Sequence, residues 1–111
     1  MTPSLPLMRS KSVCVKPIKL ISEAETEIWE AALYDEKQER GLGSDFANEI
    51  GQSLRFIQQG PEMWPKRGRE VRRYLTDRFP FVVHYRIERD LIRVIAVAHV
   101  RRKPNYWAER V

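Results

Sequence analysis

The sequence is poor in the residues that build disulfide-bonded and metal-binding proteins. It has one cysteine, Cys14, and two histidines, His84 and His99, among 111 residues. One cysteine cannot form an intramolecular disulfide or a cysteine-based zinc cluster, and two histidines without an evident third ligand do not predict a metal site. Glycine is also scarce, and the chain contains no glycine-rich phosphate-binding pattern. We therefore expect neither a metal nor a cofactor.

Long apolar runs are missing as well. No segment approaches the roughly 18 apolar residues of a membrane-spanning helix. The opening residues, MTPSLPLMRSKS, are broken by prolines and lack the apolar core of a signal peptide. A content of 42% apolar and 32% charged residues is typical of a globular domain. We expect a cytoplasmic protein with a flexible extension at residues 1–11 and a single domain at residues 12–111.

Acidic residues are unevenly distributed. Residues 1–20 carry four basic side chains and no acidic one, residues 21–65 carry three basic and ten acidic, and residues 66–111 carry thirteen basic and five acidic. The three segments contribute net charges of +4, −7 and +8, which add to +5. Folding should turn this asymmetry into a basic face that attracts an acidic partner, either protein or nucleic acid. In the other interpretation, the arginines only keep the surface of a small sheet solvated and bind no partner.

The apolar pattern in the first half predicts one strand and then a helix. VCVKPIKLI at residues 13–21 is typical of a strand, and Pro17 indicates an edge position or a bulge. Ser22 and Glu25 have the spacing of a capping box, which predicts a helix that continues to a stop near Gly41. We expect its inward face to consist of Ala24, Ile28, Ala31, Ala32 and Tyr34.

A second helix has the clearer pattern. Ser44 is placed to cap it, and Gly60 followed by Pro61 ends it. Apolar residues recur along one stripe at spacings of four, four and three, at Phe46, Ile50, Leu54 and Ile57. This spacing predicts a core-facing stripe rather than a ligand site. The short GLGS link makes the two helices an antiparallel hairpin.

After residue 70 the apolar pattern alternates, which predicts strands. EVRRYLT, FPFVVHYRI and LIRVIAVAHV are typical of three antiparallel strands, with a tight turn at residues 88–90. The last run is apolar on both faces and therefore belongs in the centre of the sheet. The predicted fold class is α+β, with an N-terminal strand, a helical hairpin and a three-stranded antiparallel meander in one sheet.

The closing segment, AVAHVRRKPNYWAERV, contains the side chains that could take part in catalysis or in binding a partner. His99 ends an apolar strand and is followed by a cationic cluster and by Tyr106 and Trp107. A ribonuclease needs such a base, cation and acid, but the same residues could form a tail that packs on the sheet and attracts an acidic partner. His84 is more typical of a structural histidine, and Trp107 of an aromatic plug over the core. The basic residues of this half include Arg72, Arg73, Arg78, Arg86, Arg93, Arg101, Arg102, Lys103 and Arg110.

Several segments, taken as an ordered set, resemble the RelE/ParE superfamily of bacterial toxins. They are Tyr34, GLG at 41–43 with Phe46, P-x-x-W-P at 61–65, the RFPF run at 78–81 and H-V-R-R-x-P-x-Y-W at 99–107. The resemblance spans residues 18–110 and implies the α+β toxin fold predicted above. It also implies a cognate antitoxin that lays an acidic, partly disordered segment over the sheet and helices, which would suit the basic C-terminal half.

The superfamily divides by target. RelE-like members cleave messenger RNA in the ribosomal A site with lysines, arginines and a C-terminal tyrosine, whereas ParE-like members lack most of that set and poison DNA gyrase. For the nuclease alternative, the resemblance implies a site made of His99, Arg102, Tyr106, Arg73 and Arg78. The lysine-rich strand is missing, however, and Val100 falls where the main C-terminal arginine would lie. These departures favour the ParE-like branch.

We therefore expect a ParE-like toxin that acts on gyrase and is neutralised by an antitoxin, with which it could form a hetero-oligomer. The alternatives are a ribosome-dependent endoribonuclease, which would make the protein an enzyme, and a non-catalytic binding or regulatory member. Residues expected to bind a partner are Arg72, Arg86, Arg93, Arg101 and Lys103.

Overall fold

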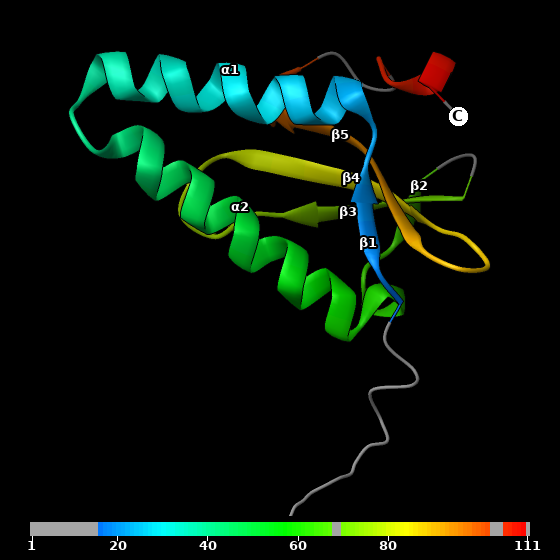
Figure 1. The fold of residues 1–111 in the computed structure, drawn as a ribbon. Helices are drawn as coiled ribbons and strands as arrows, with labels where there is room; N and C mark the ends of the chain where they lie inside the picture. The colour runs from blue at the N-terminus through cyan, green and yellow to red at the C-terminus, as the bar shows by residue number, and fades with distance from the viewer. Residues whose placement is uncertain (1–15, 68–69, 103–105, 111) are drawn as a thin grey trace, which may run out of the picture.

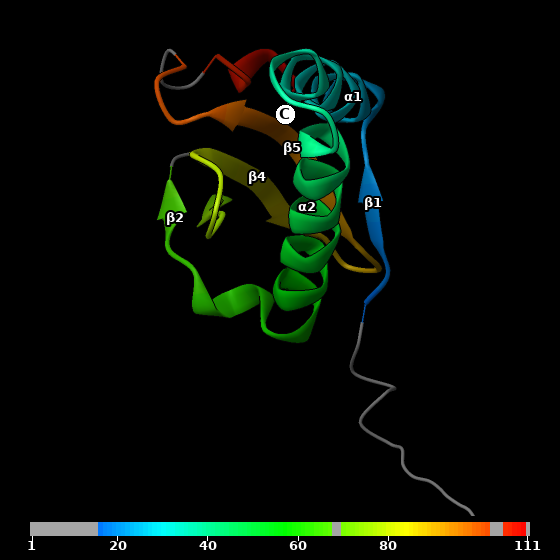
Figure 2. The same cartoon turned by 90° about the vertical axis from the view of Figure 1, so that its left-hand side faces the viewer.

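The computed structural model describes residues 16–67, 70–102 and 106–110. It contains a five-stranded sheet in the order β1-β5-β4-β3-β2, with two helices packed on one face (Figures 1 and 2). The helices are α1 (Ser22–Gln38) and α2 (Leu42–Gln59), and short 3-10 helices cover Pro61–Met63 and Ala108–Arg110. The strands are β1 (Ile18–Leu20), β2 (Lys66–Arg67), β3 (Val71–Leu75), β4 (Phe81–Ile87) and β5 (Ile92–His99). The predicted α+β fold is confirmed.

Strand β5 lies inside the sheet, between β4 and β1, as its apolar sequence predicted. It pairs antiparallel with β4 and parallel with β1. Strand β1 is an edge strand, as Pro17 indicated, but it begins only at Ile18, and residues 13–15 of the predicted strand lie outside the described residues. Strand β2 was not predicted, because two residues are too short to show an alternating pattern.

Both predicted N-terminal caps are wrong. No side chain caps α1, and the Ser22 hydroxyl lies 3.2 Å from the Glu23 carboxylate instead of closing a box with Glu25. Helix α2 begins at Leu42 rather than after Ser44, because Gly41 adopts a φ of 87° and serves as the N-cap residue. The cap is supplied from α1, since Glu36 accepts the N–H group of Gly41 at 3.0 Å.

The helix hairpin is tight at Gly43. A Cβ atom there would lie 2.5 Å from the carbonyl oxygen of Ala32, so a larger residue would push α2 away from α1. The N–H group of Gly43 also donates to Glu36 Oε1 at 3.0 Å. The GLGS link therefore fixes the hairpin by close approach as well as by its turn.

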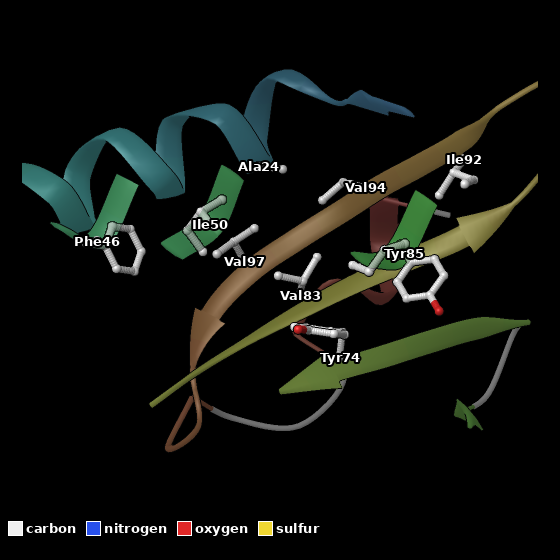
Figure 3. Packing of buried hydrophobic residues seen from close by; sticks show 10 residues of the cluster. Ala24, Phe46, Ile50, Tyr74, Val83, Tyr85, Ile92, Val94 and Val97 are labelled. Carbon is white, nitrogen blue, oxygen red and sulfur yellow. The ribbon is translucent and has the colours of Figure 1, made fainter. Parts of the chain in front are cut away.

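The core lies between the hairpin and one face of the sheet, as Figure 3 shows. The predicted α2 stripe is confirmed: Phe46, Ile50 and Ile57 are buried, and Leu54 packs at their edge. The Phe46 ring meets the rings of Phe79 and Phe81 at centroid distances of 5.4 and 4.7 Å. These contacts join α2 to the loop before β4 and to the first residue of that strand.

The inward face of α1 differs from the prediction at one residue. Ala24 is buried and Ile28, Ala31 and Ala32 pack against the core, but Tyr34 is exposed. The inward stripe continues from Ala31 and Ala32 to Asp35, which is half-buried. Tyr34 precedes Asp35 by one residue, about 100° around the helix, and therefore points to solvent.

A β-bulge in β5 distributes its apolar residues between two clusters. His84 pairs with Ala96, but Tyr85 pairs with Val94, so Ile95 is the extra residue. Val94 and Val97 join the core under the helices, whereas Ile95 and Ala96 pack on Trp107 and Val71 in a second cluster. The predicted aromatic plug is confirmed, since Trp107 is 3% exposed.

Candidate functional site

The C-terminal segment is held by Glu27, near the start of α1. The Tyr106 hydroxyl donates to Glu27 Oε2 at 2.8 Å, and the two amino groups of Arg110 donate to the two carboxylate oxygens at 3.1 Å each. The side chains of Glu27 and Arg110 are only 15% and 18% exposed. Charge-assisted bonds of this bidentate kind are strong and directional. We call Glu27, Tyr106 and Arg110 the C-terminal latch; Figure 1 shows the last described residues beside the start of α1.

The latch also covers an open edge of the sheet. Strand β1 ends at Leu20, so no strand of the described residues pairs with this edge of β5 beyond Val94. Glu27 Oε1 accepts the N–H group of Val97 at 2.9 Å, and Arg110 donates to the carbonyl oxygen of Ile95 at 3.1 Å. The latch therefore takes the place of a neighbouring strand at an edge that would otherwise be free to pair with another chain.

Tyr106, a candidate catalytic residue, has its hydroxyl proton committed to this latch. Burial raises the pKa of its phenol, and the hydrogen bond to Glu27 raises it further. Two guanidinium groups pack over the ring, with the Arg102 Cζ atom 4.1 Å and the Arg110 Cζ atom 5.1 Å from its centroid. The structure thus brings Arg102 and Tyr106 together, in an arrangement that keeps the phenol protonated.

Two other nuclease candidates lie on the helix side of the sheet. His99 is opposite Phe81, whose ring packs on Phe46 of α2, and the His99 and Phe81 centroids are 5.6 Å apart. His99 Nδ1 accepts the backbone N–H group of Arg101 at 3.0 Å. Arg78 pairs with Asp45 of α2 at 3.3 Å. Both side chains therefore have structural partners away from the latch.

Arg73 lies on the opposite face, beside His84. These residues are directly opposite each other on β3 and β4, and the His84 ring packs on Trp107 with the centroids 5.5 Å apart. Burial, and secondly the charge of Arg73, lowers the pKa of His84 from 6.5 to about 4. His84 is therefore neutral near pH 7, and the five nuclease candidates are divided between the two faces of the sheet.

Most of the residues expected to bind a partner are engaged within the chain. Arg72 donates to the carbonyl oxygen of Trp64 at 2.7 Å. Arg86 and Arg93 both pair with Glu88 at 2.9 Å, which lowers the pKa of that carboxyl group. Arg101 is exposed at the end of β5. Lys103 lies outside the described residues.

Glu27 is the functional-site residue that the sequence reasoning missed. It follows Ala24 by three positions and precedes Ala31 by four, so the helical period places it on the inward side of α1. A carboxylate there needs a cation or hydrogen-bond donors, since burying an unpaired charge is costly. Its position on the apolar side was the available signal, but its partner Arg110 is 83 residues away.

Comparison with known families decides the assignment. A family model described as the ParE toxin of the type II toxin–antitoxin system parDE matches residues 18–104. The chain belongs to the ParE toxin family. The ParE fold is also present in a solved structure, the chromosomal ParDE toxin–antitoxin system from P. aeruginosa, with a TM-score of 0.69 and 15% identity over 77% of this chain and 96% of that one. Among curated protein sequences, no match was found.

This ParE-family chain has an apolar groove between α1 and the start of α2. Its volume is about 400 Å³, and Trp29 and Leu33, one turn apart on α1, are 66% and 45% exposed beside it. The groove, called the hairpin groove below, is lined by Ile28, Trp29, Ala32, Leu33, Gly43 and Ala47, with Glu25, Glu36 and Ser44 around them. Two large apolar side chains at helical spacing in a groove are typical of a surface that receives a helix.

Among residues 16–67, 70–102 and 106–110, no group of three histidine, cysteine or acidic side chains could hold a metal ion. No helix within these ranges is long and apolar enough to cross a membrane.

Proposed function

We propose that this ParE-family toxin inhibits growth by acting on DNA gyrase in the bacterial cytoplasm, without cleaving RNA. The observation that carries the proposal is that the nuclease candidates are engaged with other residues and separated from one another. The Tyr106 hydroxyl is committed to Glu27, and Arg73 lies on the opposite face of the sheet from His99 and Arg78. A phosphoryl-transfer site needs its base, its acid and its cation around one phosphate.

Supercoiling by purified gyrase tests the target. Increasing amounts of the protein should inhibit the conversion of relaxed plasmid to the supercoiled form. Tyr106→Phe should inhibit equally when compared at a temperature where both proteins are folded, because the hydroxyl serves the latch rather than a reaction. Full supercoiling in the presence of excess folded protein would contradict the gyrase assignment.

We also propose that a cognate antitoxin neutralises this toxin by placing an apolar helix in the hairpin groove. The family assignment supports such a partner, and the exposure of Trp29 and Leu33 supports the position. Trp29→Ala should leave growth inhibition intact while weakening rescue by the co-expressed antitoxin. Met63→Ala is the matched control, because Met63 is a large apolar residue at least as exposed as Trp29, at 77% against 66%, but lies outside the groove. Equal rescue of both variants would overturn the proposed position.

The ribonuclease alternative has one observation in its favour. Arg102 stacks on Tyr106, and Arg73 lies on the face of the sheet against which the neighbouring Trp107 packs. If the protein were a nuclease, Tyr106→Phe would abolish toxicity and translated messenger RNA would be cut in the ribosomal A site. A non-catalytic regulatory member would instead leave cells growing normally when it is produced without any partner.

A further inference from the structure

Arg73, in β3, has a guanidinium Nε atom that makes no hydrogen bond to any described residue. Among the described residues, Arg72 donates to backbone carbonyl groups, and Arg86 and Arg93 share Glu88. Arg73 is half-buried, and its Nε atom is inaccessible to solvent. A buried donor without an acceptor costs free energy, and more so when the group is charged.

Among the described residues, no carboxylate forms an ion pair or hydrogen bond with Arg73. The residue directly opposite is His84, whose Nδ1 atom is also buried without a partner. Burial, and secondly the positive charge of Arg73, lowers the pKa of His84, so the histidine does not offer Arg73 a negative charge. The pair therefore leaves a local positive charge on the sheet face opposite the helices.

A cavity adjoins this charge. Its volume is about 320 Å³, and Arg73 is the charged residue in a lining that otherwise consists of Trp64, Pro65, Leu75 and Val82. Leu75, the last residue of β3, is 63% exposed beside the cavity. The cavity therefore suits one anionic group with apolar neighbours.

The edge of β3 is open beside the cavity. Strand β2 pairs with residues 71 and 72, and the last contact on this edge is the N–H group of Arg73 donating to Pro65 at 3.3 Å. On the side of β4, the backbone N–H group of Thr76 donates to the carbonyl oxygen of Phe81. Successive residues of an antiparallel strand direct their backbone groups to alternate sides, so the N–H and C=O groups of the preceding residue, Leu75, point away from β4. Within the described residues nothing pairs with Leu75 on that side.

We propose that the Arg73 cavity binds a carboxylate side chain of an extended acidic segment of the antitoxin, while the Leu75 edge pairs with the backbone of that segment. Main-chain pairing at a sheet edge together with a side-chain pocket is a common way to recognise extended peptides. This inference rests on the proposed antitoxin, but its site is separate from the hairpin groove.

A nucleic acid fits this site less well than an acidic peptide. Phosphate backbones are bound by several free cations arranged along a surface. Here the charged side chain of the cavity stands among apolar residues, and the cations two strand positions away, Arg86 and Arg93, are bound to Glu88. A carboxylate flanked by aliphatic side chains satisfies both the charge and the apolar lining.

The first test measures affinity for the antitoxin with calorimetry. Arg73→Gln removes the charge and should weaken binding about tenfold or more, as expected for a lost charge-assisted hydrogen bond. Arg89→Gln is the matched control, because it removes the same charge from an exposed turn and should change affinity less than twofold. Equal affinities of the two variants, with both shown to be folded by thermal melting, would overturn the proposal.

The second test examines the cavity without the antitoxin. Acetyl-Leu-Glu-Leu-amide should shift the NMR signals of the Arg73 Nε–H group and the His84 ring in a saturable way, and acetyl-Leu-Gln-Leu-amide should not. Shifts caused by a single-stranded oligonucleotide and not by the acidic peptide would overturn the proposal in favour of nucleic acid, and no shift with any probe would overturn it outright. If the antitoxin fails to bind wild-type toxin, the proposed function fails, while the peptide result still decides the role of the cavity.

Discussion

On the face of the sheet covered by α1 and α2, Val83, Tyr85 and Val94 are completely buried. On the other face, buried Val71 is followed two residues later by half-buried Arg73, whose Nε atom makes no hydrogen bond to the residues that the structure describes. The helix-covered face is closed by a continuous apolar core, whereas the other face is closed locally by Trp107. The comparison indicates that stability comes mainly from the helix-covered face. The other face keeps the charge of Arg73 and the open edge of β3 available to a partner.

The largest effect should come from the helix-covered face. Phe46→Ala removes a fully buried ring that contacts Phe79 and Phe81, and should lower the free energy of unfolding by about 3–5 kcal/mol. Phe56→Ala, on the exposed side of the same helix, should cost much less. Urea unfolding curves measure both, and similar losses would mean that the core is not concentrated on this face.

The C-terminal latch should matter next. Glu27→Ala leaves Arg110 without its anion and exposes the edge of β5, and should destabilise the protein by about 2–4 kcal/mol. Glu30→Ala, at an exposed position of α1, is the control and should have a small effect. The same urea measurement applies, and an unchanged midpoint for Glu27→Ala would show that the latch does not contribute to stability.

His84 predicts a dependence of stability on pH. Its pKa is lowered from 6.5 to about 4 in the folded protein, so the unfolded chain binds a proton between these values and the folded protein does not. Above pH 6.5 this difference in proton binding does not affect stability. As the pH falls from 6.5 towards 4, the free energy of unfolding should decrease by up to about 3 kcal/mol. His84→Gln should flatten this part of the stability profile. A profile identical to that of the wild type would contradict the burial of His84.

The smallest effect should come from Glu88, which Arg86 and Arg93 share at the partly exposed end of the sheet. Glu88→Gln should change the free energy of unfolding by about 1 kcal/mol or less, and the loss should shrink further in high salt. Thermal melts at low and high ionic strength measure this. A loss as large as that of Glu27→Ala would remove the distinction between the two ion-pair clusters.

The sequence was sufficient to predict the features that depend on periodicity. The stripe from Phe46 to Ile57, the central position of β5 and the burial of Trp107 follow from local apolar patterns. The predicted cap of α2 was wrong because Glu36 reaches Gly41 and Gly43 from α1, which a local motif does not reveal.

The candidate site was harder to predict than the fold. Tyr106 and Arg102 were both assigned to the nuclease alternative, but the direction of the Tyr106 hydroxyl depends on Glu27, 79 residues earlier. The extra residue in β5, Ile95, also changes which face each later side chain occupies. Without that bulge His99 would be assigned to the wrong side of the sheet, so the division of the nuclease candidates between faces needed the three-dimensional register.

The most direct test of the proposed function is the state of DNA and messenger RNA in the same arrested culture. After induction of the toxin without antitoxin, reporter plasmid is separated by topoisomer and translated messenger RNA is mapped for cleavage ends. The account predicts plasmid that has lost negative supercoiling and messenger RNA that stays intact. Normally supercoiled plasmid together with new codon-positioned RNA ends would contradict it and establish the ribonuclease alternative.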